Sequence, residues 1–379
     1  MKKIYLTSLF LIYYTLVYSQ TGNYLIRGSV STAANFLNIP ADIRGVSMGN
    51  LSVANETDAN SIFGNPGRLA FSKGLSEVAF TYTPIASGIT NDIKMLTLTG
   101  NSWIGTNEYV GLSLQYFSLG DVHFFDDQGN ETQYLRPSEF ALGGFYSRKL
   151  TDDFGIGATF KGIFSSLTGG VESGGEKSRK SISIAADFGF KGESELGEGK
   201  VTYGLSFNNI GSKISYTNTD KKSFIPMQLK FGSGYRYQLD DDNYLFSGLE
   251  FTKPLVPSAP VYDADGNIVA GKDPDRSVVS SIFTSFADSP DGFNGDLKEF
   301  GINVGVEGGL ANLVFLRAGY FMEPSQNGKN SFASFGVGFY RVFSEKRVCF
   351  DTGFLMPTAN NKALKNTFKV GISMAILDN

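Results

Sequence analysis

Apolar and polar residues alternate along most of this chain, from about residue 74 to residue 376. The alternation comes in segments of roughly ten residues that end at Gly, Asn or Asp. In the segment that begins at Phe154, the apolar residues Ile156 and Phe160 share one parity, whereas Thr159 and Lys161 occupy the other. Because successive side chains of a strand point to opposite faces, each segment is predicted to be a strand with one apolar and one polar face. Such strands suit a barrel in a lipid bilayer, whose outer face contacts hydrocarbon.

Fourteen segments of this kind predict an all-β protein, a 14-stranded antiparallel transmembrane β-barrel over residues 74–379. The predicted strands lie near residues 75–83, 93–101, 109–118, 139–148, 154–165, 180–191, 200–209, 226–238, 244–252, 299–309, 313–321, 332–342, 347–355 and 367–376. The strands at 244–252 and 313–321 carry apolar residues on both faces, so their orientation is left open. An even number of strands places the start of the first strand and the end of the last strand on the same, periplasmic side of the membrane.

Charged residues recur on the polar faces of these strands. A charge facing lipid at mid-depth costs roughly 2–4 kcal/mol, so these side chains are predicted to face the lumen. Both signs are present, whereas an open ion-selective pore usually carries rings of one sign. We therefore expect a filled lumen in which these charges pair with each other and with Arg44 or Arg68. The predicted lumen charges are Glu77, Asp187, Lys191, Lys230, Arg236, Glu299, Glu307, Arg317, Asp351 and Lys369.

The connections between the predicted strands alternate in length. Most of those after odd-numbered strands are long, and the longest covers residues 253–298. Most of the others are short turns, such as 150–153 and 344–346. Outer-membrane barrels have short periplasmic turns and long extracellular loops. The sequence thus predicts an outer-membrane barrel of a Gram-negative bacterium, in which loop 253–298 is extracellular.

Residues 1–19 are typical of a secretory signal peptide, with Lys2 and Lys3 before a short apolar run. Without these two lysines, the chain carries 31 basic and 37 acidic residues, which gives no indication of nucleic-acid binding. The single Cys349 and the single His123 argue against a disulfide framework and a multi-histidine metal site. We predict no cofactor, no metal site and no enzymatic activity.

Residues 20–73 lack the alternation and are rich in small residues and in helix caps and breakers. Fourteen strands enclose more space than their own side chains fill, since about eight strands already fill theirs. We therefore predict that this segment is a plug, or hatch, inside the lumen. The alternative is a disordered periplasmic tail.

This segment carries motifs that are recognisable in their order and spacing: Phe36-Leu37, Arg44, Met48-Gly49, residues 58–61 and Asn65-Pro66. It resembles the first part of the PorV/PorQ family, which is related to the fatty-acid-transporter (FadL-like) barrels. The resemblance implies that Asn65-Pro66-Gly67 corresponds to an Asn-Pro-Ala motif of that larger group, with Gly in place of Ala. The motif residues predicted for the plug are Arg44, Met48, Gly49, Asn65 and Pro66.

Further motifs extend the resemblance nearly from end to end and favour a PorV-type member over a PorQ-type one. They lie at residues 116–121, 139–141, 146–150, 249–251, 255–257, 289–293, 297–299 and 317–321. The resemblance implies an outer-membrane component of the type IX secretion system. Its expected partners are the large translocon barrel, the sortase-like attachment complex, the C-terminal signal domains of exported proteins, and the lipid bilayer. The alternatives are a PorQ-type paralogue and a FadL-like transporter of hydrophobic small molecules.

Loop 253–298 is the strongest candidate for partner binding, because exposed apolar residues lower solubility unless something covers them. We predict a protein-docking surface here, and the alternative is a loop that folds back to cap its own barrel. The predicted docking residues are Leu255, Val256, Pro257, Phe283, Phe286, Pro290, Asp291 and Phe293.

Other candidate chemistry has simpler interpretations. His123 follows the third predicted strand among apolar neighbours and is interpreted as a loop or rim residue, not as a catalytic base. The stretches 126–130 and 263–267 superficially resemble calcium loops but fit hairpin turns better. Cys349 shares its parity with Arg347 and Asp351, which predicts an inward-facing, packed side chain.

Overall fold

The computed structural model describes residues 26–27, 32–72, 76–85, 92–126, 128–167, 172–173, 176–177, 179–216, 222–323, 331–358 and 367–376. The predicted signal peptide, residues 1–19, lies outside these ranges. No helix among the described residues has the length and apolar character needed to cross a membrane.

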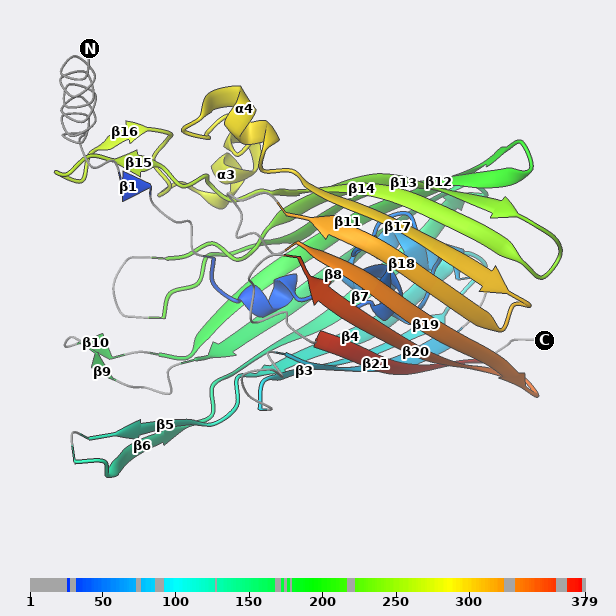
Figure 1. Ribbon diagram of the computed structural model, residues 1–379, viewed down its shortest axis with the longest axis horizontal. Coiled ribbons are helices and arrows are strands. Elements are labelled where there is room, and N and C mark those ends of the chain that lie inside the picture. The colour runs from blue at the N-terminus through cyan, green and yellow to red at the C-terminus, as the bar shows by residue number, and fades with distance from the viewer. Residues whose placement is uncertain are drawn as a thin grey trace, which may run out of the picture.

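Fourteen strands form one closed antiparallel barrel (Figure 1). In barrel order they are β2 (Ser76–Pro84), β3 (Lys94–Trp103), β4 (Glu108–Ser118), β7 (Ser138–Thr151), β8 (Phe154–Ser166), β11 (Ser181–Leu196), β12 (Gly199–Gly211), β13 (Gln228–Gln238), β14 (Tyr244–Pro254), β17 (Gly301–Leu310), β18 (Val314–Met322), β19 (Phe332–Phe343), β20 (Lys346–Pro357) and β21 (Thr367–Ile376). The barrel closes where β2 pairs with β21, with Ser76 opposite Ile376. Each strand corresponds to one predicted segment, so the predicted fold class is confirmed.

The two faces of the wall follow the predicted parity. On the outer face, Phe160 and Ile184 remain 72% and 71% exposed. On the inner face, Thr159 and Asp187 are each 2% exposed, although neither lies in an apolar core. A wall with an apolar outside and a polar inside is what a bilayer on one side and a polar lumen on the other require.

The two ends of the barrel differ in their connections. At the short-turn end, strands are joined by turns such as residues 152–153 between β7 and β8. At the long-loop end, the connections contain elements of their own (Figure 1). These are the hairpins β5 (Val122–Phe125)–β6 (Glu131–Leu135) and β9 (Glu172–Ser173)–β10 (Glu176–Lys177), and, within the longest loop, β15 (Val261–Tyr262), β16 (Ile268–Ala270), α3 (Val278–Thr284) and α4 (Gly292–Leu297).

The hairpin interpretation of the two aspartate-rich stretches is confirmed. Asp126 accepts hydrogen bonds from the backbone N–H groups of Asn130 (2.8 Å) and Gln128 (3.0 Å), while Asp263 accepts them from Asn267 (2.8 Å) and Asp265 (3.0 Å). These bonds, above all those from Asn130 and Asn267, hold the pKa of both aspartates below the usual value. Each turn is thus closed by its own carboxylate.

His123 lies on the β5–β6 hairpin, as expected for a loop residue. Its side chain is 44% exposed, and its Nδ1 lies 3.1 Å from a carboxylate oxygen of Glu131. Cys349 is buried on the inner face of β20, which confirms its predicted orientation.

The described N-terminal part of the chain consists of short elements inside the barrel and, for β1, beyond its long-loop end (Figure 1). They are β1 (Ile26–Arg27), η2 (Asn35–Asn38), α2 (Ile43–Ser47), η3 (Ala59–Phe63) and η4 (Pro66–Phe71). β1 pairs with β15 of the long loop, so this part of the predicted plug segment lies outside the lumen. The chain then runs through the barrel and continues into β2 from the short-turn end.

Candidate functional site

Residues 33–72, here called the luminal segment, contact the inner wall along their length. At the long-loop end, the backbone N–H of Ala33 donates to the carbonyl of Phe224 (2.8 Å), which precedes β13. Phe36 is 1% exposed and packs in a cluster with Ile163 and Leu255. The apolar anchor at this end therefore joins the luminal segment, the barrel wall and the base of the long loop.

A buried ionic network holds the middle of the luminal segment. The Arg44 Nε donates to Oε2 of Glu307 (2.9 Å), and its Nη2 contacts Oε1 of the same carboxylate. Arg317 Nε donates to Glu307 (2.6 Å), and its Nη1 donates to Asp351 (2.5 Å). The side chains of Arg44 and Glu307 are 6% and 0% exposed. Removing one partner from a buried ion pair leaves an uncompensated charge, so this network strongly favours the observed position of α2.

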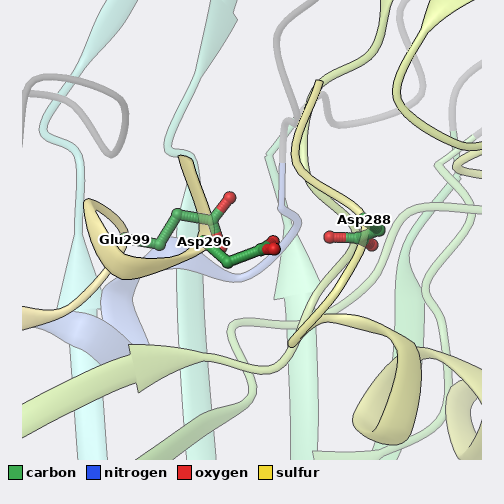
Figure 2. Close-up of side chains that lie close together, drawn as sticks. All are labelled: Asp288, Asp296 and Glu299. Atoms are coloured by element: carbon green, nitrogen blue, oxygen red, sulfur yellow. The ribbon is translucent and has the colours of Figure 1, made fainter. Parts of the chain in front are cut away.

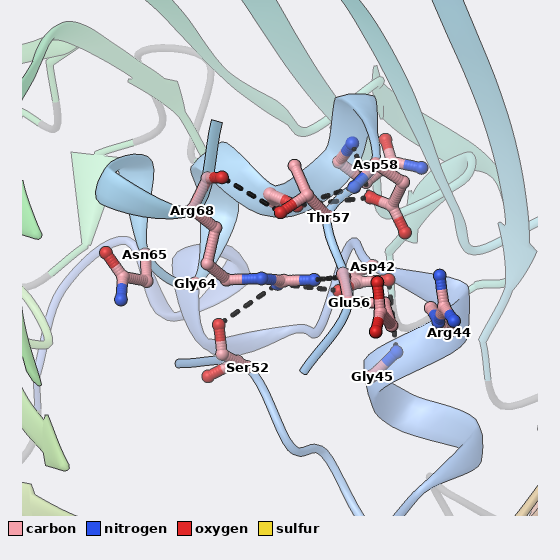
Figure 3. Close-up of polar contacts among 12 residues, drawn as sticks. Asp42, Arg44, Gly45, Ser52, Glu56, Thr57, Asp58, Gly64, Asn65 and Arg68 are labelled. Atoms are coloured by element: carbon pink, nitrogen blue, oxygen red, sulfur yellow. Dashed lines mark hydrogen bonds and ion pairs between the residues drawn. The ribbon is translucent and has the colours of Figure 1, made fainter. Parts of the chain in front are cut away.

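A second arginine organises the luminal segment internally (Figure 3). Arg68 is completely buried and its Nη1 donates to Asp42 Oδ2 (3.3 Å) and to the carbonyl of Ser52 (3.0 Å). Its Nη2 donates to the carbonyl of Glu56. The Asp42 side chain also caps α2 by accepting from the N–H of Gly45 (3.1 Å). One guanidinium thereby ties the start and end of the luminal segment to its middle.

Glu250 on β14 binds the turn that follows α2 through hydrogen bonds. Its carboxylate accepts from the backbone N–H groups of Ser52 (2.6 Å) and Val53 (2.9 Å) and from the Ser52 hydroxyl (2.9 Å). Lys230 Nζ donates to the same hydroxyl (3.2 Å). The sequence analysis missed Glu250, because its strand carries apolar residues on both faces.

Asn65 and Pro66 fix the luminal segment near the short-turn end. Asn65 Nδ2 donates to the carbonyls of Val53 (2.9 Å) and Phe190 (2.8 Å), and its Oδ1 accepts from the N–H of Gly67 (2.9 Å) at the start of η4. Pro66 occupies the first position of η4, where its missing N–H costs nothing. The segment packs here against Gly157 and Gly189, which are paired across β8 and β11. A Cβ on either glycine would clash with the luminal segment.

Met48 and Gly49 cross a row of small residues on the opposite wall. Gly248, Gly305 and Gly319 are paired across β14, β17 and β18, and Ser334 continues the row on β19. The Gly49 N–H donates to the Ser334 hydroxyl (2.9 Å), and Gly49 adopts a φ of 68°, which favours glycine. Each of the five predicted plug-motif residues therefore contacts the barrel wall or another part of the luminal segment.

Most predicted lumen charges are paired as expected. Further pairs are Lys161–Asp187 (2.9 Å), Lys191–Glu193 (2.9 Å) and Arg236–Glu56 (2.7 Å). The prediction for Glu299 is wrong, because this residue precedes β17 and contacts Lys253 at the base of the long loop. The predicted strand 299–309 began two residues too early, because Glu299 and Phe300 end the loop and β17 begins at Gly301.

The long loop 253–298 has a buried base and an exposed surface. Leu255 is 0% exposed, its N–H donates to the carbonyl of Met227 (2.9 Å), and its carbonyl accepts from the Ser281 hydroxyl (2.9 Å). By contrast, Phe283 on α3 and Phe293 on α4 are 75% and 74% exposed. Of the other predicted docking residues, Pro257 is buried, Val256 and Pro290 are half-buried, and Phe286 and Asp291 are exposed. The loop thus caps its barrel with one part and presents aromatic side chains with another.

Three buried carboxylates form the one group of possible metal ligands among the described residues (Figure 2). They belong to Asp288, Asp296 and Glu299, and their oxygen atoms lie within 4.8 Å of one another. Each has a protein partner: Asp288 accepts from the Ser258 hydroxyl (2.7 Å), Asp296 from the N–H of Ser289 (3.0 Å), and Glu299 from Lys253. These hydrogen bonds and ion pairs hold together the loop on which Phe283 and Phe293 are exposed.

The wall and the luminal segment together define a transmembrane β-barrel of the outer membrane whose lumen contains part of its own chain. The model of the family described as type IX secretion system protein PorV matches residues 25–261, more than half of the chain. The chain belongs to this family, and membership confirms the expectation of a non-enzymatic protein.

Solved structures with the same fold are FadL-like barrels, as the resemblance predicted. They include the toluene transporter TodX of Pseudomonas putida (12% identity, TM-score 0.52, covering 93% of this chain and 100% of that one). The monoaromatic hydrocarbon channel CymD has 14% identity and a TM-score of 0.51, with coverage of 89% and 97%. The toluene transporter TbuX of Ralstonia pickettii has 10% identity and a TM-score of 0.50, with coverage of 89% and 98%. No relative among curated proteins matches the chain.

Proposed function

We propose that this barrel binds the C-terminal signal domain of exported proteins and shuttles them from the translocon to the sortase-like attachment complex. The observation that carries this proposal is the pair of exposed aromatic side chains, Phe283 and Phe293, on the long loop 253–298. Buried anchors of aromatic type dominate the affinity of most protein interfaces. The luminal segment acts as a plug in this proposal, so the cargo is held at the loops and does not pass through the barrel.

The proposal predicts that the docking aromatics are needed for cargo release. In a strain that lacks the chromosomal gene, the intact chain is expected to restore release of a reporter with a C-terminal signal domain. The double variant Phe283→Asp/Phe293→Asp is expected to lower release roughly tenfold or more, since loss of one hot-spot aromatic costs about 2 kcal/mol or more. Release is measured by immunoblotting of the medium and of the cell fraction.

Phe125→Asp is the matched control, because Phe125 is also exposed (61%) at the long-loop end but lies on the β5–β6 hairpin. It is expected to support normal release. If the strain without the gene releases the reporter normally, the proposed function is wrong. If the double variant also supports normal release, the docking surface lies elsewhere.

The proposal also requires the long loops to face the outside of the cell. Cys349 is buried, so single cysteines introduced at exposed positions can be labelled against a low background. In intact cells, a membrane-impermeant maleimide is expected to label Phe293→Cys at the long-loop end but not Asp241→Cys at the short-turn end. After lysis, both are expected to react. The reverse pattern in intact cells would contradict the proposed orientation.

A second candidate function is transport of a hydrophobic small molecule. It is favoured by the fold shared with TodX and CymD, which are described as a toluene transporter and a monoaromatic hydrocarbon channel. A PorQ-type role in the same secretion system is less favoured, because the matching family model is that of PorV. Bound lipid in the purified barrel, without any protein partner, would support the transport function.

A further inference from the structure

A chamber of about 690 Å³ lies inside the barrel between the luminal segment and the long-loop ends of the strands. Its wall includes Pro254 at the end of β14, Gly301 at the start of β17 and Thr367 at the start of β21, all at the long-loop end. The luminal segment contributes residues 35, 37–40, 50 and 63 to the lining. The chamber therefore lies at the same end of the barrel as the proposed docking surface.

Two lysines line this chamber: Lys230 reaches Glu250 through the Ser52 hydroxyl, whereas Lys369 contacts no carboxylate among the described residues. Its side chain is 1% exposed, and Nζ donates to the carbonyl of Pro40 and to the hydroxyl of Thr83 (3.0 Å). Both acceptors are uncharged, and the third N–H has no partner within the described part of the chain. The carboxylate of Asp42, which acts on this ammonium at longer range, is already paired with Arg68.

Several other buried cations of the lumen contact a carboxylate directly. Arg44 and Arg317 both contact Glu307, and Lys161 contacts Asp187. Burying a charge is costly unless it is paired and hydrogen-bonded. Lys369 therefore retains an unmet preference for an anion.

Thr367 adds a second donor beside Lys369. It lies two residues earlier on the same face of β21, also lines the chamber and is 3% exposed. Its hydroxyl has no hydrogen-bond partner among the described residues. Buried hydroxyl groups are normally hydrogen-bonded, and this one is free to donate to a ligand group that also accepts from Lys369.

The rest of the lining limits what can carry the anion. The lining contains apolar side chains such as Phe321, Phe332 and Leu355 as well as carboxamides and hydroxyls such as Asn35 and Thr252. A hydrocarbon chain matches only the apolar part of this lining. An extended peptide suits such a wall, because it offers both backbone polar groups and side chains.

We propose that the chamber binds the C-terminal end of a peptide, with the free carboxylate accepting from Lys369 Nζ and from the Thr367 hydroxyl. Capture of a terminal carboxylate is a recurring mode of peptide recognition. The identification of the natural ligand as the last residues of an exported protein rests on the proposed function, which it deepens. A fatty acid carries the same carboxylate on a hydrocarbon chain and is the competing source.

The test compares two fluorescein-labelled hexapeptides copied from the C-terminus of a secreted protein of the same cell, one with a free acid and one with a C-terminal amide. Binding to the full-length barrel in detergent is measured by fluorescence anisotropy. The acid is expected to bind roughly tenfold or more tightly than the amide, since a charged acceptor makes the stronger hydrogen bonds. Equal binding of the two peptides, or binding of neither, would overturn the proposal.

Two variants assign the preference to the proposed donors. Lys369→Met is expected to abolish the difference between acid and amide, and Lys369→Arg to preserve it. Thr367→Val is expected to weaken acid binding a few-fold without lowering the melting temperature, because the hydroxyl has no partner to lose. An unchanged acid-to-amide ratio in Lys369→Met shows that the lysine only supports the luminal segment and contradicts the proposal.

A competition arm separates the two sources of a carboxylate. Palmitate is expected to displace the acid peptide only weakly, and tighter binding of palmitate than of the peptide would assign the chamber to a fatty acid instead. All of these measurements use the isolated barrel and are independent of secretion. Failure of the peptide to bind therefore leaves the cargo-release test standing, and failure of that test leaves acid-specific binding standing.

Discussion

Glu307→Ala is expected to destabilise the barrel by about 3–5 kcal/mol and to release the luminal segment. The Glu307 carboxylate is fully buried and accepts from Arg44, Arg317 and the hydroxyl of Tyr244 (2.6 Å). Its removal leaves the guanidinium of Arg44 buried without a carboxylate, while Arg317 keeps only Asp351. Because Arg44 is the ionic anchor of α2, this helix is expected to leave its place on the wall.

Two measurements check this result. The temperature at which the folded form disappears on unheated denaturing gels is expected to fall. The ion conductance of the purified barrel in planar bilayers is expected to rise, because the lumen of an unplugged barrel is water-filled. The second readout tests the plug role directly, which a loss of stability alone would not do.

The control is the double variant Arg44→Met/Glu307→Met, which replaces the pair by apolar side chains of similar length. Replacement of a buried pair by packed apolar groups is often nearly neutral, so the double variant is expected to be more stable than Glu307→Ala. Glu307→Ala with unchanged stability and conductance would show that the network does not hold the segment.

The barrel could be predicted from sequence because its cause is local. A strand between lipid and lumen needs one apolar face, so the period of two is written into each segment independently of its neighbours. The ends of the elements were less certain. β11 continues to Leu196, beyond the predicted end at residue 191, because its polar extension beyond the bilayer carries no alternation.

The two ambiguous strands are explained by the luminal segment. Tyr244 and Phe246 of β14 and Phe315 of β18 face inward and form a cluster with Met48 and Leu51. The inner wall is apolar at these points because the segment brings apolar side chains of its own. A single strand's pattern cannot reveal this, since the partner is far away in the sequence.

The same distance hid the key contacts of the site. Arg44 and Glu307 are separated by 263 residues, so their pairing could be expected as a kind of contact but not as a specific one. The helices of the long loop were also missed. Ser277, whose side chain caps α3 by accepting from the N–H of Ser280 (3.2 Å), was a usable signal for the first of them.

Gly305→Ala is expected to displace the luminal segment by steric conflict. A Cβ at this position would lie 2.5 Å from the Cβ of Met48 and well within contact distance of the Met48 carbonyl oxygen. Overpacking in a well-packed interior typically costs about 1–3 kcal/mol, and backbone atoms give way less easily than a flexible side chain. We expect a cost at the upper end of this range and a segment detached from the wall near Gly49.

Limited proteolysis in detergent measures this displacement. Arg44 and Arg68 are buried in the intact barrel, so trypsin is expected to cleave at them slowly, whereas in Gly305→Ala both sites are expected to be cleaved rapidly. Gly308→Ala is the matched control on the same strand, because a Cβ there meets nothing within 4 Å. Its cleavage is expected to match that of the unaltered chain. Equal resistance of the two glycine variants would show that the row of small wall residues is not what admits the luminal segment, and the close approach of Met48 to β17 would lose its explanation.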